Sequence, residues 1–290
     1  MLRILVTGAS GQLGAYLLEP LLRAGHKLVA WSHVEAGERL GVPLRPVNLA
    51  DERAVAGALA ESDPEVILHA GGISSADAVR RDPQRGWDVN VGGTLNLTRW
   101  CRDRGRRLVF ISTDMVFGGT RSWYSEEDPV DPILAYGRSK AEAERHVLEV
   151  SGGLVTRLSL LYGESRAGRE SFFVRALADL AAGRPREFFD DEYRTPLHYR
   201  TAAECLVGLL EAGADGIVHV GGRERLSRLE LMRRAASAVG LDPSLALPAP
   251  RDRGEQGEPR PADLSLATAR LERLLPDLER PNIEAALRQA

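Results

Sequence analysis

The chain has 290 residues, of which 43% are hydrophobic and 27% charged. This is enough for one large α/β domain, or for a nucleotide-binding domain with a smaller lobe. The formal net charge of −3 gives no electrostatic case for binding nucleic acid or an anionic membrane. No segment approaches the roughly 20 apolar residues of a membrane-spanning helix, and Cys101 and Cys205 lack the spacing of a metal or redox motif. We therefore expect a soluble, cytoplasmic protein without a metal site.

The first predicted element is a strand that leads into a glycine-rich turn. Arg3–Thr7 is short, apolar and rich in β-formers, and leucines at helical spacing follow the turn as far as Ala24. Glycines spaced G-x-x-G-x-x-G let the backbone approach a pyrophosphate, whose charge the helix N-terminus then meets. A purely structural turn is the alternative, but the preceding strand and the following helix favour dinucleotide binding. The expected contacts come from Gly8, Ser10, Gly11, Gln12, Leu13 and Gly14.

Strand-like and helix-like segments then alternate along the chain. Strands are predicted at Lys27–Ser32 and at residues 44–47, 65–69, 107–112 and 154–160, and helices at residues 52–60, 87–102 and 136–150. Repeated βα units predict an α/β fold with a doubly wound parallel sheet of the Rossmann type, whose ligands lie at the carboxyl ends of the strands. Residues 8–14, 70–72 and 112–114 come at the ends of predicted strands, so we expect them to share one edge of the sheet.

The pattern changes beyond about residue 162. Helices are predicted at residues 172–182, 201–211 and 227–239, a strand at Gly216–Val220, a solvated loop at the acidic residues 190–192 and a further loop at residues 248–261. Ser227, with Glu230 three residues later, matches a capping box. We predict an NAD(P)-binding domain over residues 1–163, to which residues 196–222 return. A smaller lobe over residues 164–290 would mainly bind substrate.

Tyr136 and Lys140 form a candidate acid/base pair. Only two of the chain's 38 basic residues are lysines, and Lys140 comes four positions after Tyr136. Positions i and i+4 share one face of a helix, so the phenol and the ammonium can converge. A neighbouring cation stabilises a phenolate and lowers the pKa of the tyrosine. A solvated helix face is the alternative interpretation.

These motifs together resemble the extended short-chain dehydrogenase/reductases and, within them, the dTDP-4-dehydrorhamnose reductase group. The resemblance extends over most of the chain. It rests on TGASGQLG at residues 7–14, HAGG at 69–72, DVNVGGTLNL at 88–97, ISTDMVFGG at 111–119, YGRSK at 136–140, RLSLLYG at 157–163, DEYRTP at 191–196 and RPADLSL at 260–266.

The resemblance implies catalytic roles for three residues. Tyr136 is the general acid, Lys140 binds the ribose hydroxyls while lowering the pKa of the tyrosine, and Thr113 hydrogen-bonds the substrate oxygen. Ser112 is the alternative for this hydroxyl role. Elementary chemistry agrees, because hydride delivery to a ketone leaves an alkoxide that needs a proton and hydrogen-bond donors. Asn90 would anchor the active-site helix or a water in the proton path, unless it only packs the helix.

The resemblance also implies a cofactor site. Ala70, Gly71 and Gly72 would let the cofactor lie against the backbone, beside Asn90, Ser112, Tyr136 and Lys140. NAD-binding proteins usually have a carboxylate at the end of the second strand, whereas Ser32 and His33 stand here and could hydrogen-bond a 2′-phosphate. NADP is therefore favoured, and NAD is possible. Asn48 and Leu49 would contact the adenine, although aspartate is common at position 48 in this family.

Three functions are compatible with these residues. The first is an NADPH-dependent reductase of a nucleotide-linked 4-keto sugar, with dTDP-4-dehydro-L-rhamnose as the first choice. The chain departs from the reductase group at Leu160, where that group often has an aromatic residue, and at Thr201, where aspartate is common. These departures weaken the choice of sugar. The second is a sugar-nucleotide epimerase or dehydratase, although dehydratases place Asp-Glu after the catalytic threonine and this chain has Asp114-Met115.

The third function is a non-catalytic partner that resembles the regulatory subunit of methionine adenosyltransferase, which shares this fold. The expected partner in the first two cases is a nucleotide sugar. A homodimer is left open by the sequence, as is a magnesium ion at a dimer interface.

Overall fold

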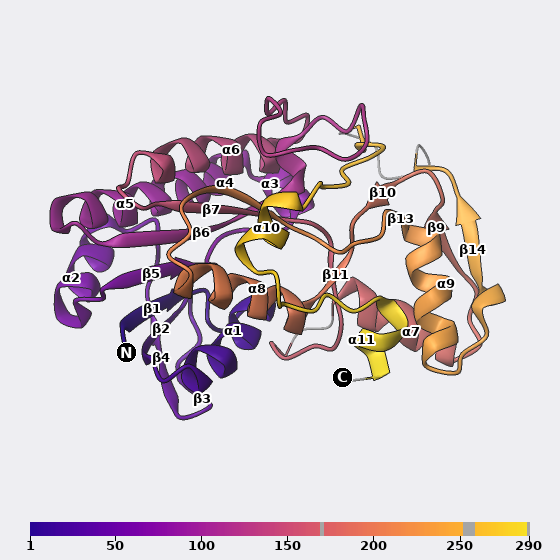
Figure 1. Ribbon diagram of the computed structural model, residues 1–290, viewed down its shortest axis with the longest axis horizontal. Coiled ribbons are helices and arrows are strands. Elements are labelled where there is room, and N and C mark those ends of the chain that lie inside the picture. The colour runs from indigo at the N-terminus through magenta and orange to yellow at the C-terminus, as the bar shows by residue number, and fades with distance from the viewer. Residues whose placement is uncertain (169–170, 252–258, 289–290) are drawn as a thin grey trace.

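The computed structural model describes residues 1–168, 171–251 and 259–288, and the central element of these residues is an eight-stranded sheet (Figure 1). The strand order is β12-β7-β6-β5-β1-β2-β4-β3, and every neighbouring pair is parallel except β3 with β4. These strands are β1 Arg3–Thr7, β2 Lys27–Ser32, β3 Gly37–Arg39, β4 Val42–Pro46, β5 Val66–His69, β6 Arg107–Thr113, β7 Leu154–Leu158 and β12 Gly216–Val220. The predicted doubly wound α/β fold is confirmed.

Helices cover both faces of the sheet (Figure 1). Their bounds are α1 Gln12–Arg23, α2 Glu52–Ser62, α3 Ala76–Arg81, α4 Pro83–Trp87, α5 Gly93–Arg104, α6 Ala135–Leu148, α8 Tyr199–Glu211 and α10 Ala269–Leu274. Apolar residues of α1 and α8 bury one face, where Ile4 and Val6 of β1 point. Those of α2, α5 and α6 bury the other, where Leu5 points. This alternation along β1 is the period of two expected of a strand covered on both sides.

A second group of elements has its own core. It comprises α7 Phe172–Ala181, β9 Arg186–Phe189, α9 Arg228–Ala238, β14 Ala246–Ala249 and α11 Ile283–Arg288. Phe173, Phe188, Met232 and Ala246 are among the residues buried there. Two short pairings come from segments that connect the large sheet to these elements along the chain. They join β8 Leu161–Tyr162 with β11 Leu197–His198, and β10 Tyr193–Arg194 with β13 Leu226–Ser227. A 3₁₀ turn, η3, spans Pro243–Leu245.

Several predicted boundaries need correction. The strand predicted at residues 154–160 ends at Leu158. A separate short strand that was not predicted, β8, follows at residues 161–162 and pairs with β11. The helix predicted at residues 87–102 is divided into α4, the π-helical turn η1 Asp88–Gly92 and α5. Pro248 lies in β14, which pairs with β9, so the predicted loop begins later than residue 248. Its residues 252–258 are outside the described ranges. The capping box of Ser227 and Glu230 is confirmed.

Within the described residues, no helix combines the length and apolar character that crossing a membrane requires.

Candidate functional site

The glycine turn between β1 and α1 has a shape that depends on the absence of side chains. Gly8 has φ +68°, and a Cβ added there would lie 2.7 Å from the Cα of Gly71. A Cβ on Gly14 would lie 2.1 Å from the carbonyl oxygen of Gly8. Gly11 is the N-cap of α1 and provides no side-chain hydrogen bond to the first turn, so backbone N–H groups of that turn remain available to an anion. The turn therefore fits a dinucleotide pyrophosphate.

Gln12 connects this turn to the segment after β8. Its side-chain Oε1 accepts hydrogen bonds from the backbone N–H groups of Arg166, at 3.1 Å, and Ala167, at 3.2 Å. Its Nε2 donates to the carbonyl oxygen of Glu164. The polar atoms of Gln12, a predicted cofactor contact, are thus occupied by another loop. Ser10 is half-buried in the turn, and Leu13 packs against the sheet core.

A chain of buried hydrogen bonds runs from the end of β1 across β5 to α5. Thr7 Oγ1 accepts from the N–H of Gly71 at 3.0 Å and lies 2.7 Å from His69 Nδ1. His69 Nε2 lies 3.1 Å from Thr94 Oγ1, which donates to the carbonyl oxygen of Asn90 at 2.6 Å. Burial, with the charge of Lys140, lowers the pKa of His69 to about 3. This histidine therefore stays neutral and acts as a hydrogen-bonding spacer.

Asn90 extends this chain to the helix that carries the tyrosine. Its Nδ2 donates to Ser139 Oγ at 3.0 Å, and Ser139 Oγ donates to the carbonyl oxygen of Tyr136 at 2.8 Å. Its Oδ1 accepts from the N–H of Ile73 at 2.8 Å, and a Cβ on Gly72 would lie 2.9 Å from that oxygen. Asn90, in the π-helical turn η1, thus fixes the backbone after β5 relative to α6.

The residues predicted to contact the adenosine half of a cofactor follow β2 and β4. Ser32 is buried at the end of β2 and donates through Oγ to the carbonyl oxygen of Glu35, whereas His33 is exposed. Asn48 Oδ1 accepts from the N–H of Ala50 at 3.2 Å. Leu49 is buried, and a Cβ on Gly71 would lie 2.8 Å from its Cδ1. These residues therefore lie at the same strand ends as the glycine turn.

The chemistry-bearing hydroxyls lie at the end of β6 and the start of α6. Burial, together with the charge of Asp114, raises the pKa of Tyr136, and a side-chain hydrogen bond with Thr113 opposes this rise. Thr113 Oγ1 also donates to Asp114 Oδ1 at 3.3 Å and accepts from the N–H of Met115 at 3.2 Å. The phenol of Tyr136 is therefore protonated at neutral pH.

The predicted lowering of the tyrosine pKa by Lys140 does not occur in this structure. The ammonium of Lys140 lies 3.9 Å from the centroid of the Phe110 ring, in a cation–π contact. Burial lowers the pKa of Lys140 to about 7, and the charge of Glu144 acts in the opposite direction. Burial is thus the largest influence on the pKa of both residues, upward for the Tyr136 phenol and downward for the Lys140 ammonium.

Ser112 is directed to a buried ion pair that the sequence did not indicate. Its hydroxyl donates to Glu144 Oε1, and Arg157 donates to Glu144 Oε2 through Nη2 at 2.8 Å and Nε at 3.2 Å. The side chains of Arg157 and Glu144 are 3% and 4% exposed. Glu144 lies one helical turn after Lys140, so the ion pair of Glu144 with Arg157 holds a carboxylate near the lysine ammonium.

A cleft of about 600 Å³ opens beside residues that follow β5 and β7. It is rich in phenylalanine and arginine, a combination suited to flat rings and to phosphates. Its lining includes Ser74, Ser75, Leu160, Phe172, Phe173, Arg186, Phe188, Phe189, Tyr199, Arg228 and Arg260.

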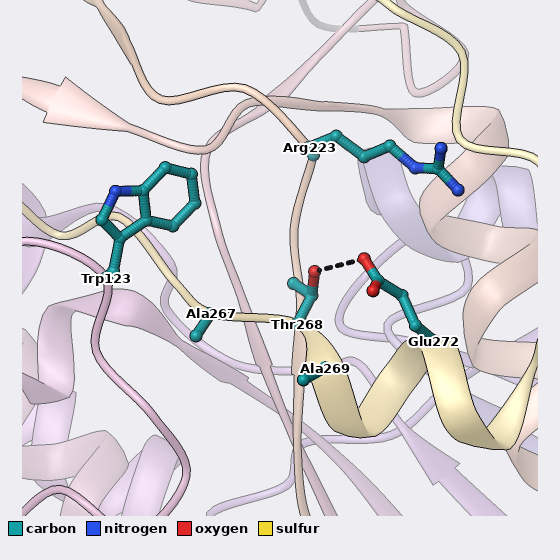
Figure 2. A pocket seen from close by; sticks show the side chains of 7 residues that line it. Trp123, Arg223, Ala267, Thr268, Ala269 and Glu272 are labelled. Atoms are coloured by element: carbon teal, nitrogen blue, oxygen red, sulfur yellow. Dashed lines mark hydrogen bonds between the residues drawn. The ribbon is translucent and has the colours of Figure 1, made fainter.

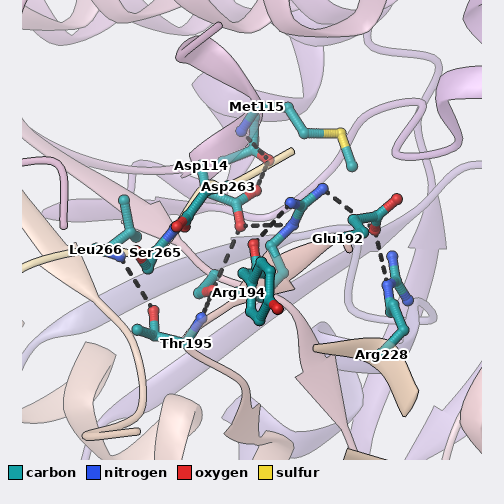
Figure 3. Close-up of polar contacts among 12 residues, drawn as sticks. Asp114, Met115, Glu192, Arg194, Thr195, Arg228, Asp263, Ser265 and Leu266 are labelled. Atoms are coloured by element: carbon teal, nitrogen blue, oxygen red, sulfur yellow. Dashed lines mark hydrogen bonds and ion pairs between the residues drawn. The ribbon is translucent and has the colours of Figure 1, made fainter. Parts of the chain in front are cut away.

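The prediction of a solvated loop at residues 190–192 is wrong for Glu192, which is 1% exposed (Figure 3). Arg228 Nε donates to Glu192 Oε1 at 2.9 Å, and Arg260 Nη1 donates to Oε2 at 3.3 Å. Arg194 Nη2 lies 3.5 Å from Oε1. Burial would raise the pKa of Glu192, but these three arginines together lower it to about 2.

Arg194 links this cluster to Asp114, which directly follows β6 (Figure 3). Its Nε lies 3.3 Å from Asp114 Oδ2, and Ser159 Oγ donates to the same oxygen at 3.3 Å. Burial raises the pKa of Asp114, while Arg194 acts to lower it. A continuous charged network therefore connects two arginines of the cleft to the residue after Thr113.

A second, smaller hollow of about 420 Å³ lies beside α10 (Figure 2). Two of its polar lining residues pair with each other, because Thr268 Oγ1 donates to Glu272 Oε1 at 3.3 Å. Thr268 Oγ1 also accepts from Arg280 Nη1 at 2.8 Å. None of the predicted site residues lines it. In the part of the chain that the structure describes, no group of three or more His, Cys, Asp or Glu side chains is placed to hold a metal ion.

This chain is similar to known proteins over most of its length. The β subunit of methionine adenosyltransferase 2 from Rattus norvegicus is 31% identical over 280 residues, which cover 94% of this chain and 82% of that protein. A dTDP-4-keto-6-deoxy-D-glucose reductase from Streptomyces niveus is 32% identical over 263 residues, covering 89% and 86%. A crystal structure of dTDP-4-dehydrorhamnose reductase from Bacillus anthracis in complex with NADP superposes with a TM-score of 0.86 at 24% identity, covering 99% of this chain and 98% of that one.

The family model described as the RmlD substrate binding domain matches residues 2–290. The resemblance inferred from the motifs is confirmed, and the chain belongs to this family.

Proposed function

We propose that the protein is an NADPH-dependent reductase of a nucleotide-linked 4-keto sugar, with dTDP-4-dehydro-L-rhamnose as the first candidate. The observation that carries this proposal is the protonated phenol of Tyr136, hydrogen-bonded to Thr113 at the carboxyl edge of the sheet. A ketone reductase needs a proton donor at this point, where the glycine turn would deliver the nicotinamide ring. The names of the reductase relatives support the reaction class.

The residues supply the parts of the reaction that the cofactor does not. When bound, NADPH provides the hydride for the carbonyl carbon. Tyr136 donates its phenolic proton to the carbonyl oxygen as that oxygen gains charge, and Thr113 stabilises the oxygen by a hydrogen bond. In this proposal Lys140 holds the ribose hydroxyls of the cofactor and so positions the cofactor beside Tyr136. Asn90 positions the start of α6 through Ser139.

The cofactor contacts remain those predicted from the turn, the residues after β5 and the ends of β2 and β4. Their shared strand ends and the tight packing of Gly8 on Gly71 support this assignment. The NADP complex of the Bacillus anthracis reductase supports the choice of NADP, and NAD is the alternative. The cleft supports a nucleotide-sugar substrate, because arginines suit a diphosphate and phenylalanines suit a base. We also propose the division into residues 1–163, with residues 196–222, and a substrate lobe.

The direct test is to offer the protein dTDP-, UDP- and GDP-linked 4-keto sugars with NADPH. Reduction is monitored as the loss of absorbance of the reduced nicotinamide. Reduction of one of these sugars supports the proposal. Stable retention of NAD with interconversion of sugar epimers would instead identify an epimerase. A product formed from a nucleotide sugar by loss of one molecule of water would identify a dehydratase.

The β subunit of methionine adenosyltransferase 2 supports a second candidate, a non-catalytic regulatory subunit, since it is as similar to this chain as the reductase is. The two functions make opposite predictions for Tyr136. A regulatory subunit would bind a methionine adenosyltransferase equally well with Tyr136→Phe and would reduce no keto sugar. Ketone reduction that disappears in this variant would exclude the regulatory function as the sole function.

Gly11→Val tests the pyrophosphate site. The φ of Gly11 is −74°, and a Cβ there would meet only the carbonyl oxygen of Gly8, at 3.0 Å, whereas a Cβ at Gly8 or Gly14 would collide with backbone. The fold should therefore persist, and NADPH affinity should fall by about 10-fold or more, the value of one charge-assisted hydrogen bond. Titration of NADPH measures the effect. Gly57→Val in α2, where a Cβ meets open space, is the control. Equal NADPH affinities of the two variants would show that the pyrophosphate does not bind at the glycine turn.

Lys140→Met tests the buried ammonium. Because burial lowers the pKa of Lys140 to about 7 from 10.5, the charged form destabilises the fold, so the variant should keep or raise the Tm. This gain should be largest below pH 7 and should vanish above pH 10.5. Turnover should fall by ~10²-fold or more, because the cofactor loses the group that positions its ribose. Lys27→Met, at the other lysine of the chain, is the control, and full activity of Lys140→Met would remove the lysine from the mechanism.

A further inference from the structure

Arg39 reaches from the edge of the sheet back to the glycine turn. It is the last residue of β3, and its Nη1 donates to the carbonyl oxygen of Ala9 at 3.4 Å. Ala9 lies between Gly8 and Ser10, and its N–H donates to the carbonyl oxygen of Trp31 in β2. The guanidinium is therefore held beside the end of β2, next to the turn.

The β3–β4 hairpin fixes this position. Arg39 pairs with Val42 across a two-residue turn in which Leu40 has φ +52° and Gly41 has φ +76°. Two successive positive φ angles are typical of the tight turns that match the twist of a hairpin. The backbone of Arg39 is thus set by strand pairing, although the hairpin is at the outer edge of the sheet.

The charges around the guanidinium favour an anionic ligand. Within the described ranges, no carboxylate forms an ion pair with Arg39, and its one hydrogen bond is the long contact to Ala9. Ser32, at the end of β2, contributes a buried hydroxyl in place of the carboxylate that would receive the ribose hydroxyls of NAD. Glu38 precedes Arg39 in β3 and so points to the opposite face of the strand. Glu35 contributes its carbonyl oxygen to Ser32.

We propose that Arg39 recognises the 2′-phosphate on the adenosine ribose of NADPH and so determines the preference for NADPH over NADH. This inference rests on the proposed function. A pyrophosphate on the N-terminus of α1 places the adenosine half of the cofactor over the ends of β2 and β4. A planar guanidinium there can donate two parallel hydrogen bonds to a phosphate. The sequence alone pointed to Ser32 and His33, because β3 was not predicted.

The test compares three ligands by direct binding titration: NADPH, NADH and 2′,5′-ADP, which carries the 2′-phosphate without the nicotinamide. In Arg39→Ala, affinity for NADPH and 2′,5′-ADP should fall by about 10- to 100-fold, the loss expected for hydrogen bonds to a charged group. Affinity for NADH should change by less than about threefold, which also shows that the fold is retained. The NADPH affinity of Arg39→Lys should lie between those of the unaltered chain and Arg39→Ala, because an ammonium keeps the charge but cannot donate two parallel hydrogen bonds.

Arg45→Ala is the matched control, since it removes the same charge from the adjacent strand β4, where Arg45 pairs with Glu61. It should leave the ratio of NADPH to NADH affinities unchanged. Equal losses for NADPH and NADH in Arg39→Ala, or no loss for either, would overturn the proposal. Failure to reduce any keto sugar would contradict the proposed activity alone, because these ratios are measured without a sugar.

Discussion

Replacing Tyr136 with phenylalanine should lower turnover by about 10²- to 10⁴-fold, the range that a general acid contributes, while NADPH binding stays near that of the unaltered chain. The ring remains, so packing at the start of α6 is retained, and only the proton donor is lost. Because burial and Asp114 raise the pKa of Tyr136, the phenol should remain protonated across the neutral range. Steady-state rates with the reducible keto sugar, together with an NADPH titration, measure both effects.

The matched control is Tyr162→Phe, which removes another buried phenolic hydroxyl. Tyr162 is 2% exposed, lies in β8 and belongs to the second core. Its hydroxyl has no part in the proposed proton transfer, so this variant should keep its turnover. Tyr136→Phe with turnover equal to that of Tyr162→Phe would show that another group protonates the substrate.

Glu192→Gln should destabilise the fold by about 3–5 kcal/mol, the usual cost of leaving buried charge uncompensated. The amide preserves the size of the side chain but removes the charge that Arg194, Arg228 and Arg260 share. Urea-induced unfolding at neutral pH measures the loss. Asp179→Asn is the control, because Asp179 is also paired with two arginines, Arg184 and Arg186, but at the surface. Solvent screens such pairs, so its midpoint should change little.

The pH dependence provides a second readout for Glu192. The folded-state pKa is lowered to about 2 from an ordinary value of 4.5, so the carboxylate contributes its full stabilisation above about pH 4.5. That contribution is lost as the pH falls towards 2. The acid limb of the stability curve should therefore be flatter in Glu192→Gln than in the unaltered chain. Parallel acid limbs would show that the pKa of Glu192 is not lowered in the folded protein.

Local patterns were sufficient to predict much of the fold. The apolar run of β1, the glycines that follow it and the leucines of α1 lie within about 20 residues, so their pattern reports short-range geometry directly. The capping box at Ser227 is local for the same reason. The split at Leu158 was not predictable in this way. β8 exists because Leu161 pairs with Leu197, 36 residues away, and no local pattern encodes that partner.

In the candidate site, too, residues in local motifs were predicted and residues with distant partners were not. Tyr136, Thr113 and the glycines lie in short motifs, which made them visible in the sequence. Glu192 was misassigned because two of the three arginines that neutralise it, Arg228 and Arg260, lie 36 and 68 residues away, so the acidic run looked solvated. The pKa of Tyr136 is raised and not lowered, because burial is the largest influence on this phenol, and spacing on a helix shows proximity but not burial.

The position of β12 constrains how the protein can be made. β7 is buried along all five residues and lies between β6 and β12 in the sheet. A chain that stops near residue 163 would leave β7 as a bare apolar edge, the kind of surface that recruits other strands. During synthesis the sheet can be completed only after residue 220 has left the ribosome, when only α7 and β9 of the second group of elements are already outside. One cut therefore cannot release a free-standing nucleotide-binding unit.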